Sequence, residues 1–159
     1  MATPTTERVV SVLSPGTDER RDSDGQRWSR LALGRRLGCE LLGASVYVLA
    51  PGSGTWPYHA HLANEELLLV LAGSATVRTP DGEVRVATGD AITFPRGPAG
   101  SHEIRNDGNG PCRIVIVSTM VEPEVAHFPD DESYVVFAGA PPVPGGTSRR
   151  STGAVSPGD

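Results

Sequence analysis

Residues 54–73 read GTWPYHAHLANEELLLVLAG, and this stretch carries both a structural signal and a chemical one. Residues two apart on an extended strand point to the same face, so His59 and His61 can direct their imidazoles toward one ion. Glu65 and Glu66 follow after a short bend and precede an apolar run that ends at Gly73. This order predicts two strands that bring imidazole and carboxylate groups together.

The segment 61–72 also contains good helix formers, so helix propensity alone would make it helical. Its surroundings favour a strand instead. It is followed by Gly73, by an alternating segment at 75–79, and by Pro80-Asp81-Gly82, which is a hairpin signal.

Short strands and turns continue along most of the chain, and no apolar period typical of a long helix is present. We expect a loop at 14–26, and residues 34–43 are ambiguous. Many short strands at such spacing predict an all-β sandwich or barrel. The expected strands are 28–33, 44–50, 66–72, 75–79, 83–87, 91–94, 102–105, 112–120 and 134–138, with a further edge strand at 9–13.

Length and composition indicate one globular domain of 159 residues with a net charge of −5. All 14 basic residues are Arg, which excludes a Schiff-base lysine, and the negative charge argues against nonspecific nucleic-acid binding. Cys39 and Cys112 do not form a disulfide framework. We expect a cytoplasmic protein without membrane association, because no signal peptide or long apolar run is visible.

Three regions follow from composition. Residues 1–27 are predicted to be an N-terminal arm and loop, and residues 28–138 the β-barrel domain. Residues 139–159 are rich in Pro, Gly and Ser and are expected to be a disordered or loosely packed tail.

Two segments together resemble the motifs of the cupin superfamily. In the first, Glu66 follows the HxH pair and is separated from Gly73 by six residues. The second, GDAITFPRGPAGSHEIRN at 89–106, matches at Gly89, Pro95, Gly97, His102 and Asn106. The spacer from Gly97 to His102 holds four residues where two are usual. The resemblance implies a double-stranded β-helix, related to the jelly roll, in a single-cupin protein that is commonly a homodimer.

The resemblance also implies a metal site inside the barrel mouth, formed by His59, His61, Glu66 and His102. Glu65 would replace Glu66 if the strand register slipped by one residue. Three imidazole nitrogens and one carboxylate suit one divalent transition metal per chain: Fe is the first expectation, and Mn, Ni, Co, Cu and Zn are alternatives.

Three functions are compatible with such a site on a small-molecule substrate or ligand. The first is oxygen-dependent oxidation by a non-heme iron dioxygenase. The second is a metal-dependent isomerase, lyase or hydrolase, for which Glu65 or Tyr58 would be the base. The third is a non-catalytic module that binds a small ligand.

Other side chains carry weaker expectations. Trp56 and Tyr58 either line the pocket mouth or pack ordinarily, and packing is favoured. Arg78 and Arg96 are expected to be solvated rather than to bind an acidic substrate. His127 is expected at the surface, and Cys112 as a buried, inert thiol.

Overall fold

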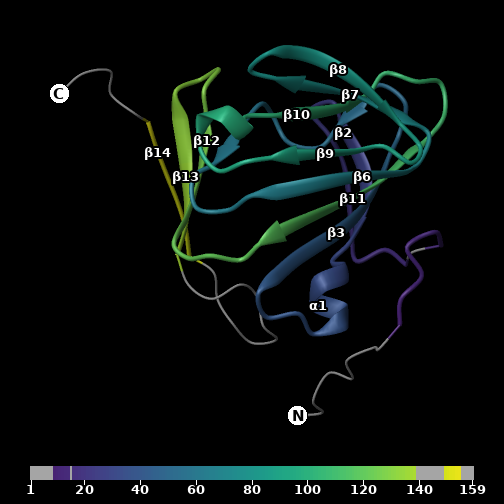
Figure 1. Ribbon diagram of the computed structural model, residues 1–159, viewed down its shortest axis with the longest axis horizontal. Helices are drawn as coiled ribbons and strands as arrows, with labels where there is room; N and C mark the ends of the chain where they lie inside the picture. The colour runs from purple at the N-terminus through teal and green to yellow at the C-terminus, as the bar shows by residue number, and fades with distance from the viewer. Residues whose placement is uncertain (1–8, 15, 139–148, 155–159) are drawn as a thin grey trace.

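The computed structural model describes residues 9–14, 16–138 and 149–154, which form antiparallel strands and very little helix (Figure 1). The helical elements are α1 (Leu33–Leu37) and the 3₁₀ turn η1 (Pro98–Gly100). The strands are β1 (Glu19–Ser23), β2 (Gln26–Leu31), β3 (Leu42–Leu49), β4 (Ser53–Gly54), β5 (Ala60–His61), β6 (Glu66–Ala72), β7 (Ser74–Thr79), β8 (Gly82–Ala87), β9 (Ala91–Phe94), β10 (Glu103–Asn106), β11 (Cys112–Thr119), β12 (Glu124–Phe128), β13 (Ser133–Ala138) and β14 (Arg149–Ala154). This architecture confirms the predicted all-β class.

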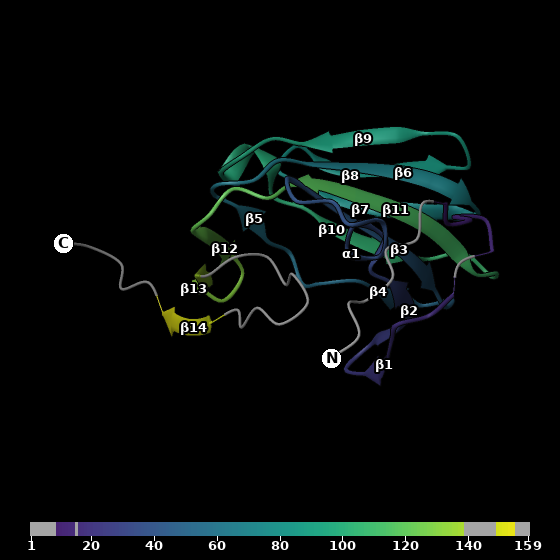
Figure 2. The same ribbon diagram turned by 90° about the horizontal axis from the view of Figure 1, so that it is seen from below.

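The described strands form three sheets. A six-stranded sheet has the order β1-β2-β3-β11-β6-β9, and a four-stranded sheet has the order β4-β10-β7-β8. The third sheet, β14-β13-β12-β5, lies at one end of the other two in both views (Figures 1 and 2). Since β5 contains His61 and directly follows His59, this third sheet adjoins the candidate site.

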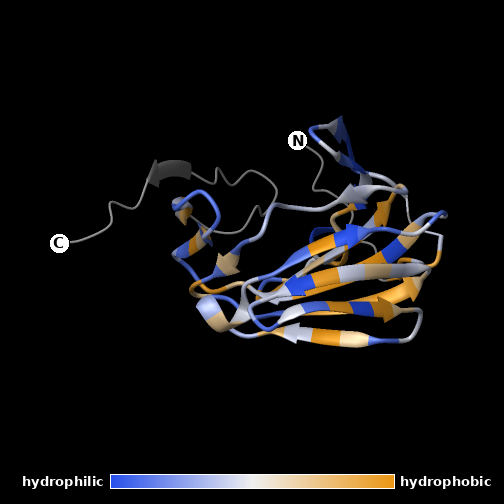
Figure 3. Ribbon diagram, turned by 90° about the horizontal axis from the view of Figure 1, so that it is seen from above, coloured by the Kyte–Doolittle hydropathy of each residue, from blue (hydrophilic) through white to orange (hydrophobic). Residues whose placement is uncertain are grey.

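The main hydrophobic core lies between the six-stranded sheet and the sheet of β10 and β7. Leu49, Leu68, Val77, Ile104 and Ile114 from five strands are at most 1% exposed and belong to one cluster. Hydrophobic and hydrophilic residues alternate along several of these strands, as the colouring in Figure 3 shows. The strand period of two therefore turns one face of each of these two sheets toward the main core, as the alternation in the sequence predicts.

Two predictions near the N-terminus are wrong. The expected loop at 14–26 contains β1, which forms a hairpin with β2 through Asp24 and Gly25. Both turn residues have positive φ, and Asp-Gly is a hairpin signal. The sequence did not predict β1, because its five residues are polar and exposed and therefore show no apolar alternation. Residues 9–13 are not a strand, although Val10 and Val12 pack on a second apolar cluster.

The end of the chain includes a strand that the sequence did not indicate. β12 pairs with β13 on one side and with β5 on the other, where Ala126 lies opposite His61. In the predicted tail, β14 pairs with β13, and the remainder of that tail and residues 1–8 lie outside the described residues. Among the residues that the structure describes, no helix is long and apolar enough to span a membrane.

Candidate metal centre

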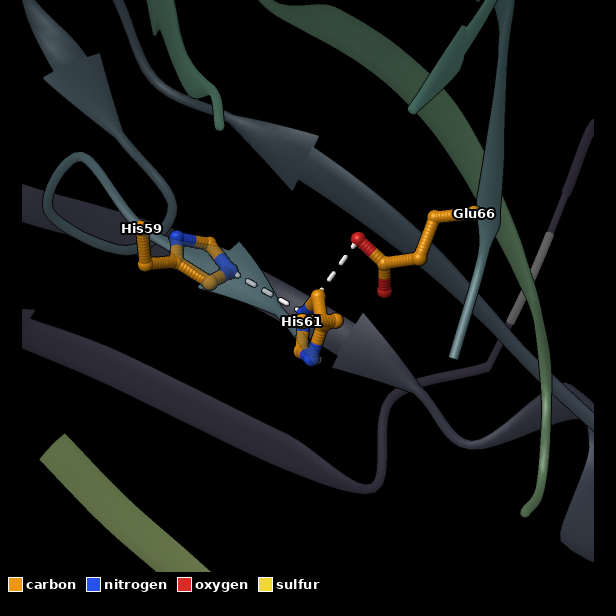
Figure 4. Close-up of side chains that lie close together, drawn as sticks. All are labelled: His59, His61 and Glu66. Carbon is orange, nitrogen blue, oxygen red and sulfur yellow. Dashed lines mark hydrogen bonds and ion pairs between the residues drawn. The ribbon is translucent and has the colours of Figure 1, made fainter. Parts of the chain in front are cut away.

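The HxH pair directs both rings to one point. β5 ends at His61, and His59 forms an isolated antiparallel bridge with His102, through two backbone hydrogen bonds of 3.0 and 2.8 Å. The Nε2 atoms of His59 and His61 are 3.2 Å apart, and Figure 4 shows the two rings turned toward each other. The shared face that strand geometry predicts is therefore observed.

Glu66, at the start of β6, brings a carboxylate to the same point (Figure 4). Its Oε2 lies 3.4 Å from Nε2 of His61 and 3.2 Å from Nε2 of His102. The register of β6 selects this residue, because Leu68 on the same face is fully buried in the core. Glu65 faces the other way and is exposed, so the structure places Glu66 at the cluster rather than its neighbour.

His102 reaches the cluster despite the longer spacer before it. The extra residues fold into η1, and the chain passes so close to itself that a Cβ on Gly100 would clash with the carbonyl oxygen of Pro95. The His102 ring is 2% exposed and stacks on Phe94 at a centroid distance of 3.7 Å. A compact turn thus absorbs the additional length and leaves the imidazole aimed at Glu66.

Backbone carbonyls orient two of the three rings. Nδ1 of His59 is 2.7 Å from the carbonyl oxygen of Pro57, and Nδ1 of His102 is 2.9 Å from that of Gly100. A carbonyl oxygen can only accept, so each Nδ1 carries the proton and each Nε2 keeps its lone pair for the centre.

The electrostatics of the cluster favour a neutral His59 imidazole and an ionised Glu66 carboxylate. Burial, reinforced by repulsion from His102 and His61, lowers the pKa of His59 to about 3. Burial by itself would raise the pKa of Glu66, but the contact with His102 and the nearby imidazoles lower it overall. Burial opposes protonation of His61, yet the contacts with Glu124 and Glu66 raise its pKa above the usual value.

The donor set suits a divalent transition metal. The nearest ligand atoms of His59, His61 and Glu66 all lie within 4.8 Å of one another, and His102 contacts the same carboxylate. Three imidazole nitrogens and a carboxylate oxygen are ligands that Fe, Mn, Ni, Co, Cu and Zn accept. The residues present therefore fit the group that the sequence motifs imply.

A cavity of about 610 Å³ opens beside the cluster. Its floor includes Tyr47 of β3 and Ile116 of β11, and its walls include Trp56, Phe128 and Phe137. Phe128 stacks on the His59 ring at a centroid distance of 5.7 Å. A planar apolar molecule in this cavity would lie against aromatic rings and next to the candidate ligands.

Several other expectations can be compared with the structure. Trp56 lines the cavity, whereas Tyr58 lies outside it beneath the Arg78 guanidinium, which is 3.9 Å from the ring centroid. Arg78 also forms a salt bridge with Asp130 at 2.6 Å, and Arg96 is exposed. Neither arginine lines the cavity.

Two further expectations concern His127 and Cys112. Cys112 is fully buried, as expected, and burial raises its thiol pKa. His127 lies on β12 between the buried Ala126 and Phe128, and it is partly exposed on the opposite face of the strand.

Sequence reasoning missed two residues of β12 that shape the site. Glu124 and Phe128 both face inward, and the carboxylate of Glu124 lies 3.7 Å from Nδ1 of His61. Both residues lie far along the chain from the HxH pair, so no local sequence pattern connected them with the site. The one available hint was the i, i+2, i+4 spacing of Glu124, Ala126 and Phe128, which a strand would place on one face.

We expect metal affinity to depend on pH mainly through His61. An imidazole ligates only when its nitrogen is unprotonated, so a raised pKa lets protons compete with the metal at and somewhat above the usual 6.5. His59, with a pKa of about 3, competes only in strong acid. Competition titrations with zinc between about pH 5 and 8 measure this dependence. Below the pKa of His61, the zinc affinity should fall roughly tenfold for each pH unit. A constant affinity over that range would contradict the imidazole ligands.

Comparisons with known proteins agree with this architecture. Residues 45–118 match the family model described as "Cupin domain". The tetracenomycin polyketide synthase protein TcmJ of Streptomyces glaucescens is 37% identical over 100 residues, which cover 62% of this chain and 64% of that protein. This chain therefore matches less than two thirds of that relative's length.

Two solved structures share the fold. A sugar phosphate isomerase of the cupin superfamily from Silicibacter pomeroyi has a TM-score of 0.70 and 24% identity, over 80% of this chain and 76% of that one. The polyketide cyclase RemF from Streptomyces resistomycificus has a TM-score of 0.59 and 23% identity, over 71% and 79% of the two chains. Together, the family match, the antiparallel barrel and the two sequence motifs show that residues 45–118 form a cupin domain.

Proposed function

We propose that this protein is a metal-dependent cupin enzyme that acts on an aromatic or poly-carbonyl intermediate of polyketide biosynthesis. The observation that carries the proposal is the position of His59, His61, Glu66 and His102 at one end of a largely apolar cavity with aromatic walls. The sequence relative named as a polyketide synthase protein supports the choice of substrate class.

The lining of the cavity is mostly apolar, and Arg30, Arg35 and Glu40 add charged groups to it. Tyr47, Trp56 and Phe128 offer ring faces and edges, and such contacts favour planar conjugated molecules. The volume of about 610 Å³ lies in the range of small-molecule sites. Binding would also displace water from the space beside the imidazoles, so a reacting carbonyl would face the cluster in an apolar environment.

In this proposal the three imidazoles and Glu66 hold one divalent metal. When bound, that ion supplies Lewis acidity toward a carbonyl oxygen. The chain's own part is to hold the substrate against Phe128 and Trp56 and to keep His59 and His102 turned inward through Pro57 and Gly100.

The reaction class that fits this substrate best is carbonyl condensation, within the lyase and isomerase classes expected from the sequence. Ring closure joins the carbon next to one carbonyl to the carbon of another and then releases water. It therefore needs no oxidant or reductant. Oxygen-dependent oxidation, the first expectation from the sequence, differs because it consumes oxygen, and the two reactions are separable in one assay.

The test begins with protein purified without a metal-chelating tag and analysed for its elements. The loaded protein is then incubated with a synthetic poly-β-ketone thioester, while product mass and dissolved oxygen are followed. Loss of one water without oxygen uptake would support condensation, and gain of oxygen atoms with oxygen uptake would support oxidation instead. Tight binding without turnover would indicate a ligand-binding module, and failure to bind any divalent metal would overturn the proposal.

Replacing Phe128 with Ala should weaken ligand binding by about tenfold, because an aromatic wall contributes on the order of 1–2 kcal/mol. Quenching of tryptophan fluorescence by 1,8-dihydroxyanthraquinone measures this affinity. Tyr58→Ala is the matched control, since that ring lies outside the cavity beneath Arg78. Equal losses in the two variants would show that the ligand does not sit against Phe128.

A further inference from the structure

We propose that Glu124 is a positioning residue that orients His61 within the cluster, an inference that rests on the metal binding proposed above. The carboxylate comes from β12, in the third sheet, and approaches the ring from the side opposite to Glu66. His61 thus lies between two carboxylates, with Glu66 at Nε2 and Glu124 at Nδ1.

The three imidazoles are supported in two different ways. His59 and His102 each donate from Nδ1 to a carbonyl oxygen two residues earlier in the chain. The Nδ1 atom of His61 instead faces Oε1 of Glu124 at 3.7 Å. The first two rings are therefore set by local backbone, whereas the third depends on a side chain from a distant strand. A carboxylate is also a stronger acceptor than a carbonyl when the donor is an imidazole.

Glu124 is itself held in place by a buried network. Its Oε1 accepts a hydrogen bond from the backbone N–H of Leu62 at 3.1 Å, and its Oε2 accepts one from Nδ2 of Asn64. The amide oxygen of Asn64 in turn accepts from the Thr119 hydroxyl at 2.9 Å and from the backbone N–H of Val121 at 2.6 Å. These hydrogen bonds hold the carboxylate beside the His61 ring, 3.7 Å from Nδ1.

Burial and cavity geometry separate positioning from direct catalysis. The Glu124 side chain is 11% exposed and does not line the cavity, so it cannot reach a ligand there. A buried carboxylate is costly unless it is paired and hydrogen-bonded, and His61 is the imidazole that pairs with it. Carboxylates that accept the second ring N–H of a ligating histidine fix its tautomer and orientation.

Removing the carboxylate charge should weaken metal binding without moving the other two imidazoles. In E124Q we expect zinc affinity, measured by competition with a chelator, to fall by about 10–100-fold, which is the usual effect of losing such a partner. Glu65→Gln is the matched control, because it removes an equal charge from an exposed side chain of the adjacent bend. Its affinity should equal that of the wild type.

Nitrogen–proton NMR of the zinc-loaded protein separates this role from general destabilisation. The Nδ1–H signals of His59, His61 and His102 report three different acceptors. E124Q should shift or broaden the His61 signal alone, whereas a loss of packing would move all three.

In E124Q the new amide group would place an N–H against a donor, either Nδ2 of Asn64 or the backbone N–H of Leu62. E124D is therefore the second variant, because it keeps the negative charge and has a shorter side chain. It should also alter only the His61 signal. If the wild type binds zinc but both variants keep its affinity, or both leave the His61 signal unmoved, this inference alone is overturned. A wild type that takes up no zinc would overturn the proposed function as well.

Discussion

Glu66→Ala should reduce bound metal from one ion per chain to a small fraction of that amount. The substitution removes the carboxylate that lies 3.4 Å from His61 and 3.2 Å from His102, and with it the negative charge at the centre of the cluster. Loss of a partner that only supports a ligand costs about 10–100-fold in affinity, so loss of a ligand should cost more. Elemental analysis after dialysis measures the change.

Glu65→Ala is the control for this experiment. The side chain is exposed, and its replacement should leave metal content unchanged. The comparison tests strand register directly, because neighbouring residues on a strand point to opposite faces. Similar losses in both variants would mean that the carboxylate ligand has been assigned to the wrong residue.

Ile104→Ala should lower the free energy of unfolding by about 2–5 kcal/mol, the usual cost of removing a buried aliphatic side chain. Ile104 is 1% exposed and packs in the main core, two residues after His102 on β10. The vacated volume lies among residues from several strands, which cannot all close around it. Urea titration followed by circular dichroism measures the loss.

Val84→Ala provides the comparison for the core substitution. Val84 lies on β8 and is 41% exposed, so its truncation should change stability by less than about 0.5 kcal/mol. If Ile104→Ala were equally mild, the packing between β10 and the six-stranded sheet would be looser than described.

The HxH pair and Glu66 show how much local rules can predict. Strand parity put His59 and His61 on one face, and the family spacing of six residues between the glutamate and Gly73 favoured Glu66 over Glu65. The structure brings these three side chains together as the sequence indicated.

His102 required more than local rules. Its spacer is two residues longer than the usual motif, and no sequence rule states where the additional residues go. The structure shows that Pro98–Gly100 form a 3₁₀ turn, which the close approach of Gly100 to Pro95 makes compact. The position of His102 is therefore a property of this loop and of the bridge to His59.

The sequence by itself determined the strand-rich architecture, the shared face of the two HxH imidazoles and the preference for Glu66, because each follows from the strand period or a family spacing. Tertiary structure alone decided the contribution of β12. Glu124 and Phe128 reach the site because Ala126 pairs with His61, and pairing between distant strands leaves no periodic trace in either one. The stretch around His59 and His61 thus supplies candidate ligands. Glu124 of β12, which lies 62 residues after Leu62 in the chain, orients His61.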